Sequence, residues 1–489
     1  MIPLTLAEIA RAVGGTLSDT DGTPVVTGSV EFDSRKVTEG GLFVAIPGER
    51  VDGHDFAAAA IRDGAVGVLA ARPVGVPAVV VPPVSEAHTR SVALTGDTDG
   101  SGAAVLAGLA ALARTVVDRL TDTEGLTVVG VTGSSGKTST KDLIAQVLAP
   151  LGTTVAPPGS FNSELGHPWT ALRADAKTDH LVLELSARGV GHIRSLCETA
   201  PPRIGVVLNV GTAHLGEFGS REAIAQTKGE LVEALPLDGL AVLNADDPLV
   251  AGMATRTRAR VVLVGEAEHA EIRAVEVTLD DQARARFRMI TPVGEADVAL
   301  GLHGRHHVGN ALSAAAVALE LGATPELVAQ SLSGAKRVSE RRMDVRTTPD
   351  GVTVVNDSYN ANPESMRAAL STLAAMGRTE PRRRTWAVLG VMGELGDEAV
   401  AAHDELGRLV ARLDINRLVA VGEGPDVAAI HHGASRPGSS GEESVLVPDV
   451  DAAVALLREQ LRPGDIVLVK ASKVAALWRV AEALLGDAA

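Results

Sequence analysis

The pattern of apolar and polar positions predicts strands and helices that alternate along the chain. Residues 126–132 form an apolar run, and in the segment after it apolar residues recur at positions 143, 144, 147, 148 and 151. The first pattern is typical of a buried strand, and the second, with its spacings of three and four, is typical of a helix. A short polar stretch at 133–138 separates them. This part of the sequence therefore predicts a strand, a loop and a helix.

Further apolar runs repeat this alternation in the middle of the chain. Helical stretches separate predicted strands at residues 180–185, 204–209, 240–244 and 261–264. Alternation of this kind predicts a parallel sheet with crossover helices, and such sheets bind ligands at the carboxyl ends of their strands. We therefore expect the chemistry of the protein at the residues that end these strands.

The segments on either side predict two more α/β units. Thr5 and Glu8 have the spacing of a helix capping box. Short strands are expected at 25–32, 42–46, 66–70 and 78–81, with a helix over 56–62 and, after a polar linker at 85–102, a helix over 103–120. The last segment has strands that end at Asn356 or run through TWAVLGV, RLVAVG and DIVLVKAS. We predict an α/β protein with domains at 1–95, 96–338 and 339–489.

Composition and charge narrow the classes of function. The length of 489 residues suits about three domains. The 45 Lys and Arg against 61 Asp and Glu leave a net charge of −16, which argues against a nucleic-acid or anionic-membrane surface. Aromatic residues make up 2%, too few for base-stacking platforms. The lone Cys197 excludes an internal disulfide, as in cytoplasmic proteins. Neither a signal peptide nor a membrane-spanning run is found, so we predict no membrane insertion.

The polar loop carries the clearest candidate chemistry. Its sequence, GSSGKT, lies between a buried strand and a helix, where backbone N–H groups and the helix N-terminus can bind phosphate. Lys137 can bridge the terminal phosphates, and the Thr138 hydroxyl can hold Mg²⁺. The strict form of this motif has a glycine where this chain has Val131. A tight strand-to-helix turn without function is the alternative.

Three polar residues later in this region are further candidates for a functional role. Glu184 lies near the end of HLVLEL, where a buried carboxylate is costly unless it binds a metal or a cation. An ion pair with an arginine is the alternative. His214 follows the next strand, in the sequence NVGTAH. It is either a metal or phosphate ligand or a structural histidine. Lys228 lies in the helix that begins at Ser220, where a solvated lysine is the ordinary expectation.

Candidates in the remaining parts of the chain are weaker on their own. Asn310 falls in the first turn of an alanine-rich helix, and a basic stretch containing Arg342 leads to a strand that ends at Asp357. The motif DSRK at 33–36 follows a strand and is either a binding site or a solvated strand end. Three histidines have no spacing that indicates a zinc site and are expected at the surface: His403, His431 and His432.

With these motifs the chain resembles the Mur ligase family of peptidoglycan precursor synthesis over essentially its whole length. The N-terminal segment carries DSRKV, GLFVAIPG and DGHDF, and TGSSGKT is the form of phosphate loop that this family uses. The resemblance implies a uridine-nucleotide domain, a central P-loop ATPase-type domain and a C-terminal Rossmann-like domain that closes on the nucleotide and binds the acceptor. The recurrent functional positions of the family fall on Lys137, Glu184, His214, Asn310, Arg342 and Asp357.

The resemblance also implies a role for each of these residues. Lys137 would grip the ATP phosphates, Thr138 and Glu184 would serve one Mg²⁺, and His214 would help to place a second. Lys228 matches a lysine that is carbamylated in relatives and would join His214 there. Asn310 would contact adenine, Asp357 the ribose and Arg342 the transferring phosphate. The ATP-binding set is Gly133, Ser134, Ser135, Gly136, Lys137, Thr138, Ser139, Asn310, Arg342 and Asp357, and the substrate-binding set is Ser34, Arg35, Asn162, Ser163, Asn360 and Asn362.

The motif SYNANPESM at 358–366 favours the family members that add D-alanyl-D-alanine. The implied activity is ATP-dependent ligation of D-alanyl-D-alanine to UDP-N-acetylmuramoyl-tripeptide through an acyl phosphate, by a cytoplasmic monomer. Three alternatives remain. A diaminopimelate- or lysine-adding relative differs only in its acceptor. A folylpolyglutamate synthetase usually begins near its phosphate loop, whereas about 125 residues precede the loop in this chain. A nucleotide-binding regulator would share the loop and Glu184 without ligating anything.

Overall fold

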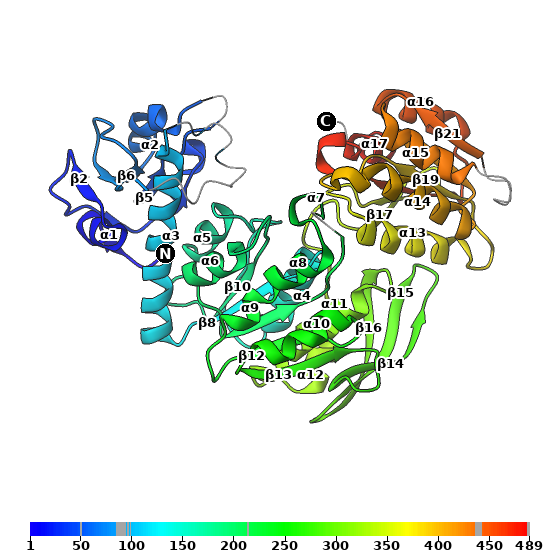
Figure 1. The fold of residues 1–489 in the computed structure, drawn as a ribbon, viewed down its shortest axis with the longest axis horizontal. Helices are drawn as coiled ribbons and strands as arrows, with labels where there is room; N and C mark the ends of the chain where they lie inside the picture. Colours follow the sequence, from blue (N-terminus) through cyan, green and yellow to red (C-terminus); the bar gives the residue numbers. More distant parts are fainter. Residues whose placement is uncertain are drawn as a thin grey trace.

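The computed structural model describes residues 1–48, 51–84, 94, 97, 99–212, 215–435 and 443–486. Three α/β units follow one another along this described chain, each built on its own sheet. Figure 1 shows the N-terminal unit in blue and the C-terminal unit in yellow to red, with the green central unit between and below them. The mixed α/β architecture predicted from the sequence is confirmed.

The N-terminal unit begins with the helix that the capping box predicts. Helix α1 (Leu6–Val13) begins with a capping box: the Thr5 side chain accepts from the Glu8 backbone N–H, and the Glu8 side chain accepts from the Thr5 backbone N–H. The predicted strand at 25–32 is instead two short strands, β3 and β4, and β3 pairs with β1 (Leu4–Thr5) away from the main sheet. The other elements are β2 (Thr16–Ser18), β3 (Val25–Val26), β4 (Val30–Glu31), η1 (Ser34–Lys36), β5 (Gly41–Val44), η2 (Gly53–Phe56), α2 (Ala57–Arg62), β6 (Ala65–Ala70) and β7 (Ala78–Val80).

Helix α3 (Ser101–Glu124) connects the first unit to the second and extends beyond the predicted 103–120. It packs against α1 and β6 on one side of the junction and against α5 (Gly166–Ala171) and α6 (His192–Thr199) on the other. Most of its buried side chains belong to one apolar cluster that includes residues of both units. The two units therefore share core along this helix, which Figure 1 shows running from one to the other.

The central sheet has the strand order β16-β15-β14-β13-β12-β11-β8-β10-β9. From β9 to β14 every pairing is parallel, as predicted, whereas β14, β15 and β16 are antiparallel and were not predicted. These three strands alternate buried and exposed residues instead of forming apolar runs. The strands are β8 (Thr127–Thr132), β9 (Thr154–Val155), β10 (His180–Glu184), β11 (Ile204–Val207), β12 (Leu240–Asn244), β13 (Arg260–Gly265), β14 (Ile272–Leu279), β15 (Arg284–Thr291) and β16 (Gly294–His303).

Helices cover both faces of the central sheet. One apolar cluster joins the sheet to α4 (Lys137–Leu148), α11 (His307–Glu320) and α12 (Pro325–Gly334). The cluster on the other face contains residues of α6, α8 and α9. The remaining elements are α7 (Leu215–Phe218), α8 (Arg221–Lys228), α9 (Glu230–Glu233), α10 (Pro248–Ala251) and η5 (Gly252–Arg256). The carboxyl ends of β8, β10 and β11, which are neighbours, are left open toward the C-terminal unit.

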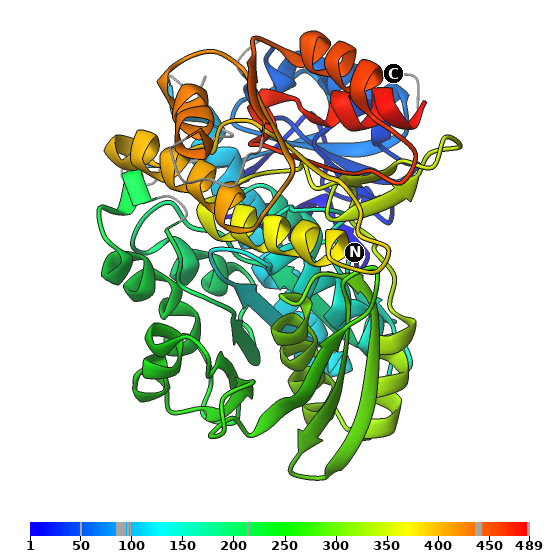
Figure 2. The ribbon, with the colours of Figure 1, turned by 90° about the vertical axis from the view of Figure 1, so that its right-hand side faces the viewer.

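The C-terminal sheet has the order β17-β18-β22-β19-β20-β21, parallel except for β17. Helices α13, α14 and α15 pack on one face and α16 and α17 on the other. Figure 2 shows this unit above the central one. Its elements are β17 (Asp344–Thr347), β18 (Thr353–Asn356), α13 (Pro363–Gly377), β19 (Thr385–Leu389), η6 (Gly396–Glu398), α14 (Ala399–Arg412), β20 (Arg417–Val421), α15 (Pro425–Ala434), β21 (Glu443–Val447), α16 (Val450–Gln460), β22 (Ile466–Lys470), η7 (Lys473–Ala475) and α17 (Trp478–Leu485).

The prediction that His403 lies at the surface is wrong. This histidine of α14 is fully buried. The Met392 backbone N–H donates to its Nε2 at 2.8 Å, and its Nδ1 lies 2.6 Å from the Ala399 carbonyl oxygen. Both ring nitrogens therefore have hydrogen-bond partners inside the unit. The spacing of histidines in the sequence does not reveal such a structural role.

Candidate active site

The phosphate loop is built as the sequence predicts, between buried β8 and the N-terminus of α4. Gly136 has φ +81°, in the left-handed region that favours glycine, and a Cβ there would lie 3.0 Å from the Asn310 side chain. The Lys137 Nζ folds back and donates to the Gly133 carbonyl oxygen at 2.7 Å. Burial lowers the pKa of Lys137, and Glu184 opposes that shift. The lysine therefore lies over the loop whose N–H groups would face phosphate.

Glu184 ends β10 beside the first turn of α4 and is 1% exposed. The Thr138 hydroxyl donates to its Oε2 at 2.9 Å, and the Asn162 amide donates to its Oε1 at 2.7 Å. These partners are a hydroxyl and an amide, not the arginine of the alternative reading. A buried carboxylate beside a hydroxyl offers the hard oxygen atoms that Mg²⁺ prefers. The arrangement fits the predicted metal role of Thr138 and Glu184.

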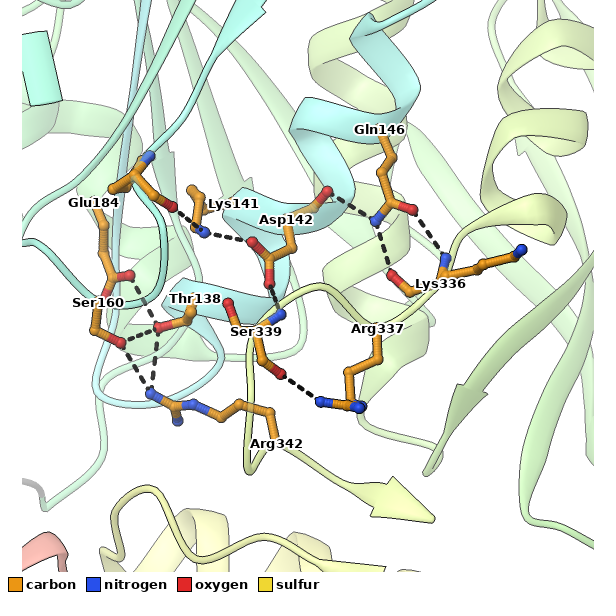
Figure 3. A network of polar contacts seen from close by, with 11 residues as sticks. Thr138, Lys141, Asp142, Gln146, Ser160, Glu184, Lys336, Arg337, Ser339 and Arg342 are labelled. Carbon is orange, nitrogen blue, oxygen red and sulfur yellow. Dashed lines mark hydrogen bonds and ion pairs between the residues drawn. The ribbon is translucent and has the colours of Figure 1, made fainter. Parts of the chain in front are cut away.

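Arg342 reaches this cluster from the chain segment that leads into the C-terminal sheet (Figure 3). Its Nη2 lies 3.3 Å from the Thr138 hydroxyl and 3.1 Å from the Ser160 hydroxyl, and those two hydroxyls are 2.8 Å apart. The guanidinium stacks on the Tyr359 ring at 4.2 Å. Its Nε is buried and has no hydrogen-bond partner among the described residues. The guanidinium is thus held beside the first turn of α4 with one N–H group buried and unpaired among the described residues.

Asp357, expected at the ribose, forms a buried ion pair with Lys470. The Lys470 Nζ donates to the Asp357 Oδ2 at 2.6 Å and to the Asn360 carbonyl oxygen at 3.0 Å. The other carboxylate oxygen accepts from the Met343 backbone N–H at 3.1 Å. Burial lowers the pKa of Lys470, and Asp357 opposes this. The pair therefore fixes Asp357 at the wall of the cleft.

Asn310 lies in the first turn of α11 beside the phosphate loop, as its sequence position predicts. Its amide is 3.3 Å from the His307 Nδ1, and the rings of His306 and His307 contact each other at 4.2 Å. Burial holds the pKa of His307 well below its ordinary value, with a further contribution from His306. A neutral imidazole and an amide therefore face the cleft, which suits an uncharged heteroaromatic ring.

Lys228 ends α8 and is 6% exposed, so the solvated lysine expected from its position is not what the structure contains. Burial lowers its pKa to about 7, with a further lowering from Lys137 and an opposing effect from Glu364. Glu364 lies on α13 and accepts from the backbone N–H of Thr212 at 2.7 Å. His214 lies outside the described residues, so its predicted role stays a prediction.

Several contacts join the C-terminal unit to the central one around the phosphate loop. The Asn362 amide donates to the Ser134 carbonyl oxygen at 3.1 Å. Arg188, after β10, pairs with Glu394 of the C-terminal unit at 3.3 Å. Together with Arg342 and the contact of Glu364 with Thr212, these contacts join the two units around the phosphate loop.

These residues surround a cleft of about 490 Å³ between the central and C-terminal units. Predicted residues that line it are Ser134, Ser135, Gly136, Lys137, Thr138, Ser139, Asn162, Glu184, Asn310, Arg342, Asp357, Asn360 and Asn362. Lining residues that the sequence reasoning missed include Ser160, Arg188, Glu394 and Lys470. Lys470 ends the apolar run DIVLVK, the same signal that singled out Glu184, and was detectable for that reason.

The predicted substrate residues divide between two places. Asn162, Asn360 and Asn362 lie at the cleft. Ser34 and Arg35 lie on η1 of the N-terminal unit and do not line it. The Arg35 side chain is 87% exposed and pairs with Asp33 at 2.9 Å. Ser163 does not line the cleft either, and its carbonyl oxygen accepts from the His167 backbone at 2.8 Å.

Family models match three stretches of this chain. They describe a Mur ligase family catalytic domain at residues 28–112, a Mur ligase middle domain at 131–318 and a Mur ligase glutamate ligase domain at 341–473. The UDP-N-acetylmuramoyl-tripeptide--D-alanyl-D-alanine ligase of Mycobacterium tuberculosis is 58% identical over 100% of this chain and 98% of its own length. The chain belongs to the Mur ligase family.

More distant members of the Mur ligase family agree with this placement. The enzyme of the same name from Escherichia coli is 33% identical over 99% of each chain. A crystal structure of MurF from Acinetobacter baumannii matches with a TM-score of 0.83 at 28% identity over 99% of each chain. The MurF ligase of Thermotoga maritima, solved in complex with ADP, matches with a TM-score of 0.75 at 29% identity over 94% of this chain and 98% of its own. Within the Mur ligase family the chain groups with MurF.

Proposed function

We propose that this protein ligates D-alanyl-D-alanine to UDP-N-acetylmuramoyl-tripeptide with hydrolysis of ATP to ADP and phosphate. The observation that carries the proposal is the 58% identity, over the whole chain, to a ligase of that name. The cleft supports it independently, because a phosphate loop, a buried carboxylate and the guanidinium of Arg342 meet there. The complex of a related MurF with ADP supports ATP as the nucleotide.

The reaction must turn an unreactive carboxylate into an electrophile. The terminal carboxylate of the tripeptide attacks the γ-phosphorus of ATP, the bond to the β,γ-bridging oxygen breaks, and ADP leaves. The amine of D-alanyl-D-alanine then attacks the acyl phosphate, and a peptide bond forms as phosphate leaves and the amine loses a proton. The first step brings two anions together, and the second develops negative charge on the carbonyl oxygen and the leaving phosphate. The protein must therefore supply positive charge and exclude water.

Lys137 and Arg342 supply that charge from opposite units. Lys137 lies over the phosphate loop and would contact the terminal phosphates. Arg342 holds its guanidinium against Thr138 and Ser160 at the cleft, where its charge would stabilise the transferring phosphate. Because Arg342 lies after the end of the central unit, its position depends on closure of the C-terminal unit.

Thr138 and Glu184 would hold one Mg²⁺. The buried Glu184 carboxylate and the Thr138 hydroxyl are hard oxygen donors on adjacent strand and helix ends, which is the donor chemistry this ion requires. When bound, Mg²⁺ neutralises charge on the phosphate oxygens. Asn162 and Ser160 hold these two side chains in place, so the site is preorganised for the ion.

Lys228 would provide a ligand for a second Mg²⁺ after carbamylation, together with His214. Its neutral Nζ forms a bond with the carbon of CO₂ and loses a proton, so a cation becomes an anion with two oxygen atoms. Burial and the nearby Lys137 favour the neutral amine that this step requires, since they lower the pKa of Lys228 to about 7.

The remaining roles follow the division of the chain into units at 1–95, 96–338 and 339–489. Asn310 would contact adenine and Asp357 the ribose. Ser34 and Arg35 would bind the uridine nucleotide from the N-terminal unit, and Asn162 with Ser163 the muramoyl part of the same substrate. Asn360 and Asn362 would contact the acceptor dipeptide near the closed cleft. A cytoplasmic location and a monomeric state stay predictions.

Phosphate release with UDP-N-acetylmuramoyl-tripeptide tests the proposal directly. The tripeptide should carry lysine in one series and diaminopimelate in another, with ATP and Mg²⁺ present. We expect release to depend on D-alanyl-D-alanine. Release stimulated instead by a single amino acid, with UDP-N-acetylmuramoyl-dipeptide as the substrate, would indicate a diaminopimelate- or lysine-adding ligase. ATP turnover that ignores every acceptor would indicate a nucleotide-binding regulator.

A further inference from the structure

The segment between α12 and β17, residues 335–343, links the central unit to the C-terminal one and carries Arg342. The α4 helix, which begins in the phosphate loop, holds this linker (Figure 3). The Gln146 side chain makes two hydrogen bonds to the backbone of Lys336. Its Nε2 donates to the Lys336 carbonyl oxygen at 3.0 Å, and its Oε1 accepts from the Lys336 N–H at 2.9 Å. The amide thereby pairs with the linker backbone as a neighbouring strand would.

A second anchor lies one helical turn earlier on α4. The Asp142 Oδ2 accepts from the Ser339 backbone N–H at 3.2 Å in a buried setting. The other carboxylate oxygen is bonded by the Lys141 Nζ, which also donates to the Pro157 carbonyl oxygen at 2.8 Å. Lys141 is 1% exposed, so its charge is compensated only by these partners. Lys141 therefore holds one oxygen of the Asp142 carboxylate while the other oxygen binds the linker.

The linker reaches the site through a strained stretch of backbone. Arg341 and Met343, the neighbours of Arg342, have φ +56° and +47°. Side chains other than glycine adopt this region at a cost, and such conformations persist only where the surroundings fix them. On the far side, the Asp357 carboxylate holds the Met343 N–H, and the Arg341 carbonyl oxygen accepts from the Tyr359 N–H. Asp142 and Gln146 supply the fixed points on the near side.

We infer that Gln146 and Asp142 are positioning residues for Arg342. One helix then carries Thr138 in its first turn and the two linker anchors in its second and third turns. Helix α4 thereby fixes the near side of the linker relative to the phosphate loop, while Asp357 and Tyr359 of the C-terminal unit fix its far side. This inference rests on the proposed function, because it assigns Gln146 an effect on phosphate transfer. Simple attachment of a linker would give a stability effect instead.

Gln146→Ala tests the inference best, because Asp142 cannot be changed without leaving the buried Lys141 unpaired. We expect kcat to fall about tenfold, the scale of losing one or two hydrogen bonds that fix a charged group, while the KM for ATP stays within about twofold. The matched control is Lys336→Ala, since Gln146 contacts only the backbone there and the Lys336 side chain is exposed. Its kcat should equal that of the wild type.

A second variant and a double-mutant cycle separate positioning from a merely structural role. Gln146→Glu keeps the acceptor for the Lys336 N–H but turns a carboxylate oxygen toward the Lys336 and Asp142 carbonyl oxygens, so its kcat should be no higher than that of Gln146→Ala. In an Arg342→Ala background, Gln146→Ala should lower kcat no further, because the two act through one group. Additive losses, or an unchanged kcat in Gln146→Ala with folding confirmed by thermal unfolding, would overturn the inference. Either result leaves the acceptor dependence, and hence the proposed function, standing.

Discussion

Lys228 illustrates how the surroundings of a single residue change its chemistry. By helical position it is a solvated lysine, yet its burial and the neighbouring Lys137 bring its pKa to about 7. A buried ammonium near a second cation is unfavourable, so the neutral amine forms readily. The fold around Lys228 thus favours the neutral amine that the proposed carbamylation needs, whereas helical position alone predicts a solvated ammonium.

Replacing Lys228 should therefore remove activity that a small carboxylate can return. We expect Lys228→Ala to be nearly inactive and Lys228→Glu to recover little, because the glutamate stem is shorter. Formate or acetate should partly restore the alanine variant by placing a free carboxylate in the vacated space. Ligation rates measured with and without these anions give the answer. Full activity of Lys228→Ala in bicarbonate-free buffer would contradict the modification.

The pKa of Lys228 also sets a pH dependence. With a pKa of about 7, roughly half of the amines are neutral at pH 7 and about one in ten at pH 6. Carbamylation requires the neutral form, so at limiting bicarbonate the activity should fall as pH decreases from 8 to 6. Added bicarbonate should shift this profile to lower pH. The formate-restored Lys228→Ala variant, which lacks the amine, serves as the control and should not respond to bicarbonate.

Lys137 is the second residue whose chemistry can be tested alone. Lys137→Ala removes the cation over the phosphate loop, and we expect ligation to be abolished while the thermal unfolding midpoint stays close to that of the wild type. The side chain bonds only a loop carbonyl oxygen and is not part of the apolar core. A variant with near-normal turnover would refute the assignment of this loop to ATP.

At the scale of elements, the residue that caps α13 also makes a contact with the central unit. Asn362 caps the helix, because its Oδ1 accepts from the Ser365 N–H at 2.9 Å. The amide nitrogen of the same side chain donates to the Ser134 carbonyl oxygen of the phosphate loop at 3.1 Å. The cap that starts a helix of the C-terminal unit thus also contacts the phosphate loop of the central one.

Two substitutions separate these roles. Asn362→Asp keeps the cap and loses the donor, so we expect stability close to wild type and a marked loss of kcat, since a carboxylate would also repel the phosphates. Asn362→Ala loses both and should in addition be less stable by about 1 kcal/mol, the usual cost of removing a cap. Chemical unfolding and steady-state kinetics on both variants measure this. Equal kcat for Asn362→Asp and wild type would show that the contact with Ser134 has no catalytic effect.

The elements also show what the sequence could and could not predict. The strand, phosphate loop and helix at 127–148, and Glu184 at a strand end, follow from apolar runs and their terminal polar residues. Strands β14 to β16 contain no long apolar run and were missed for that reason, although their alternation of apolar and polar residues is typical of an antiparallel strand. Pairings between distant residues, such as Asp357 with Lys470 and Gln146 with Lys336, depend on the meeting of units and leave no trace in local pattern.

At the scale of the whole molecule, the reaction depends on how the C-terminal unit meets the central one. Arg342, Asn362, Glu364 and Glu394 all cross that boundary to the central unit. A reactive acyl phosphate must be sheltered from water, and side chains that join the two units around the cleft are a means to do so. Closure and chemistry are therefore coupled through these side chains.

Arg342→Ala should lower kcat far more than it raises the KM for ATP. Its charge acts in the closed, reacting arrangement and so stabilises the transition state preferentially. The expected loss in kcat is roughly 10² to 10³-fold, the scale of removing one preorganised donor. A rise in KM of that size with an unchanged kcat would show that Arg342 merely binds ATP.

Arg35 belongs to the opposite end of the molecule and should behave differently. Arg35→Ala removes an exposed cation of the N-terminal unit, far from the phosphate loop in the sequence and outside the cleft. We expect weaker binding of the uridine-nucleotide substrate with little change in the affinity for ATP. Titrations of each ligand measure this. Loss of ATP affinity alone would contradict the proposed division of labour between the units.

The three tryptophans of this chain occupy three different settings. Trp169 of α5 contacts Phe32 of the N-terminal unit with ring centroids 5.8 Å apart. Trp386 lies in the C-terminal core, 1% exposed, and its indole N–H donates to Asp465 at 3.0 Å. Trp478 lies under the guanidinium of Arg341, beside the residue that enters the ATP site. Variants that keep one tryptophan at a time would therefore give intrinsic fluorescence signals that report separately on the N-terminal junction, the C-terminal core and the linker. Binding of the uridine nucleotide and closure on ATP could then be timed independently in a stopped-flow fluorimeter, without attaching a dye.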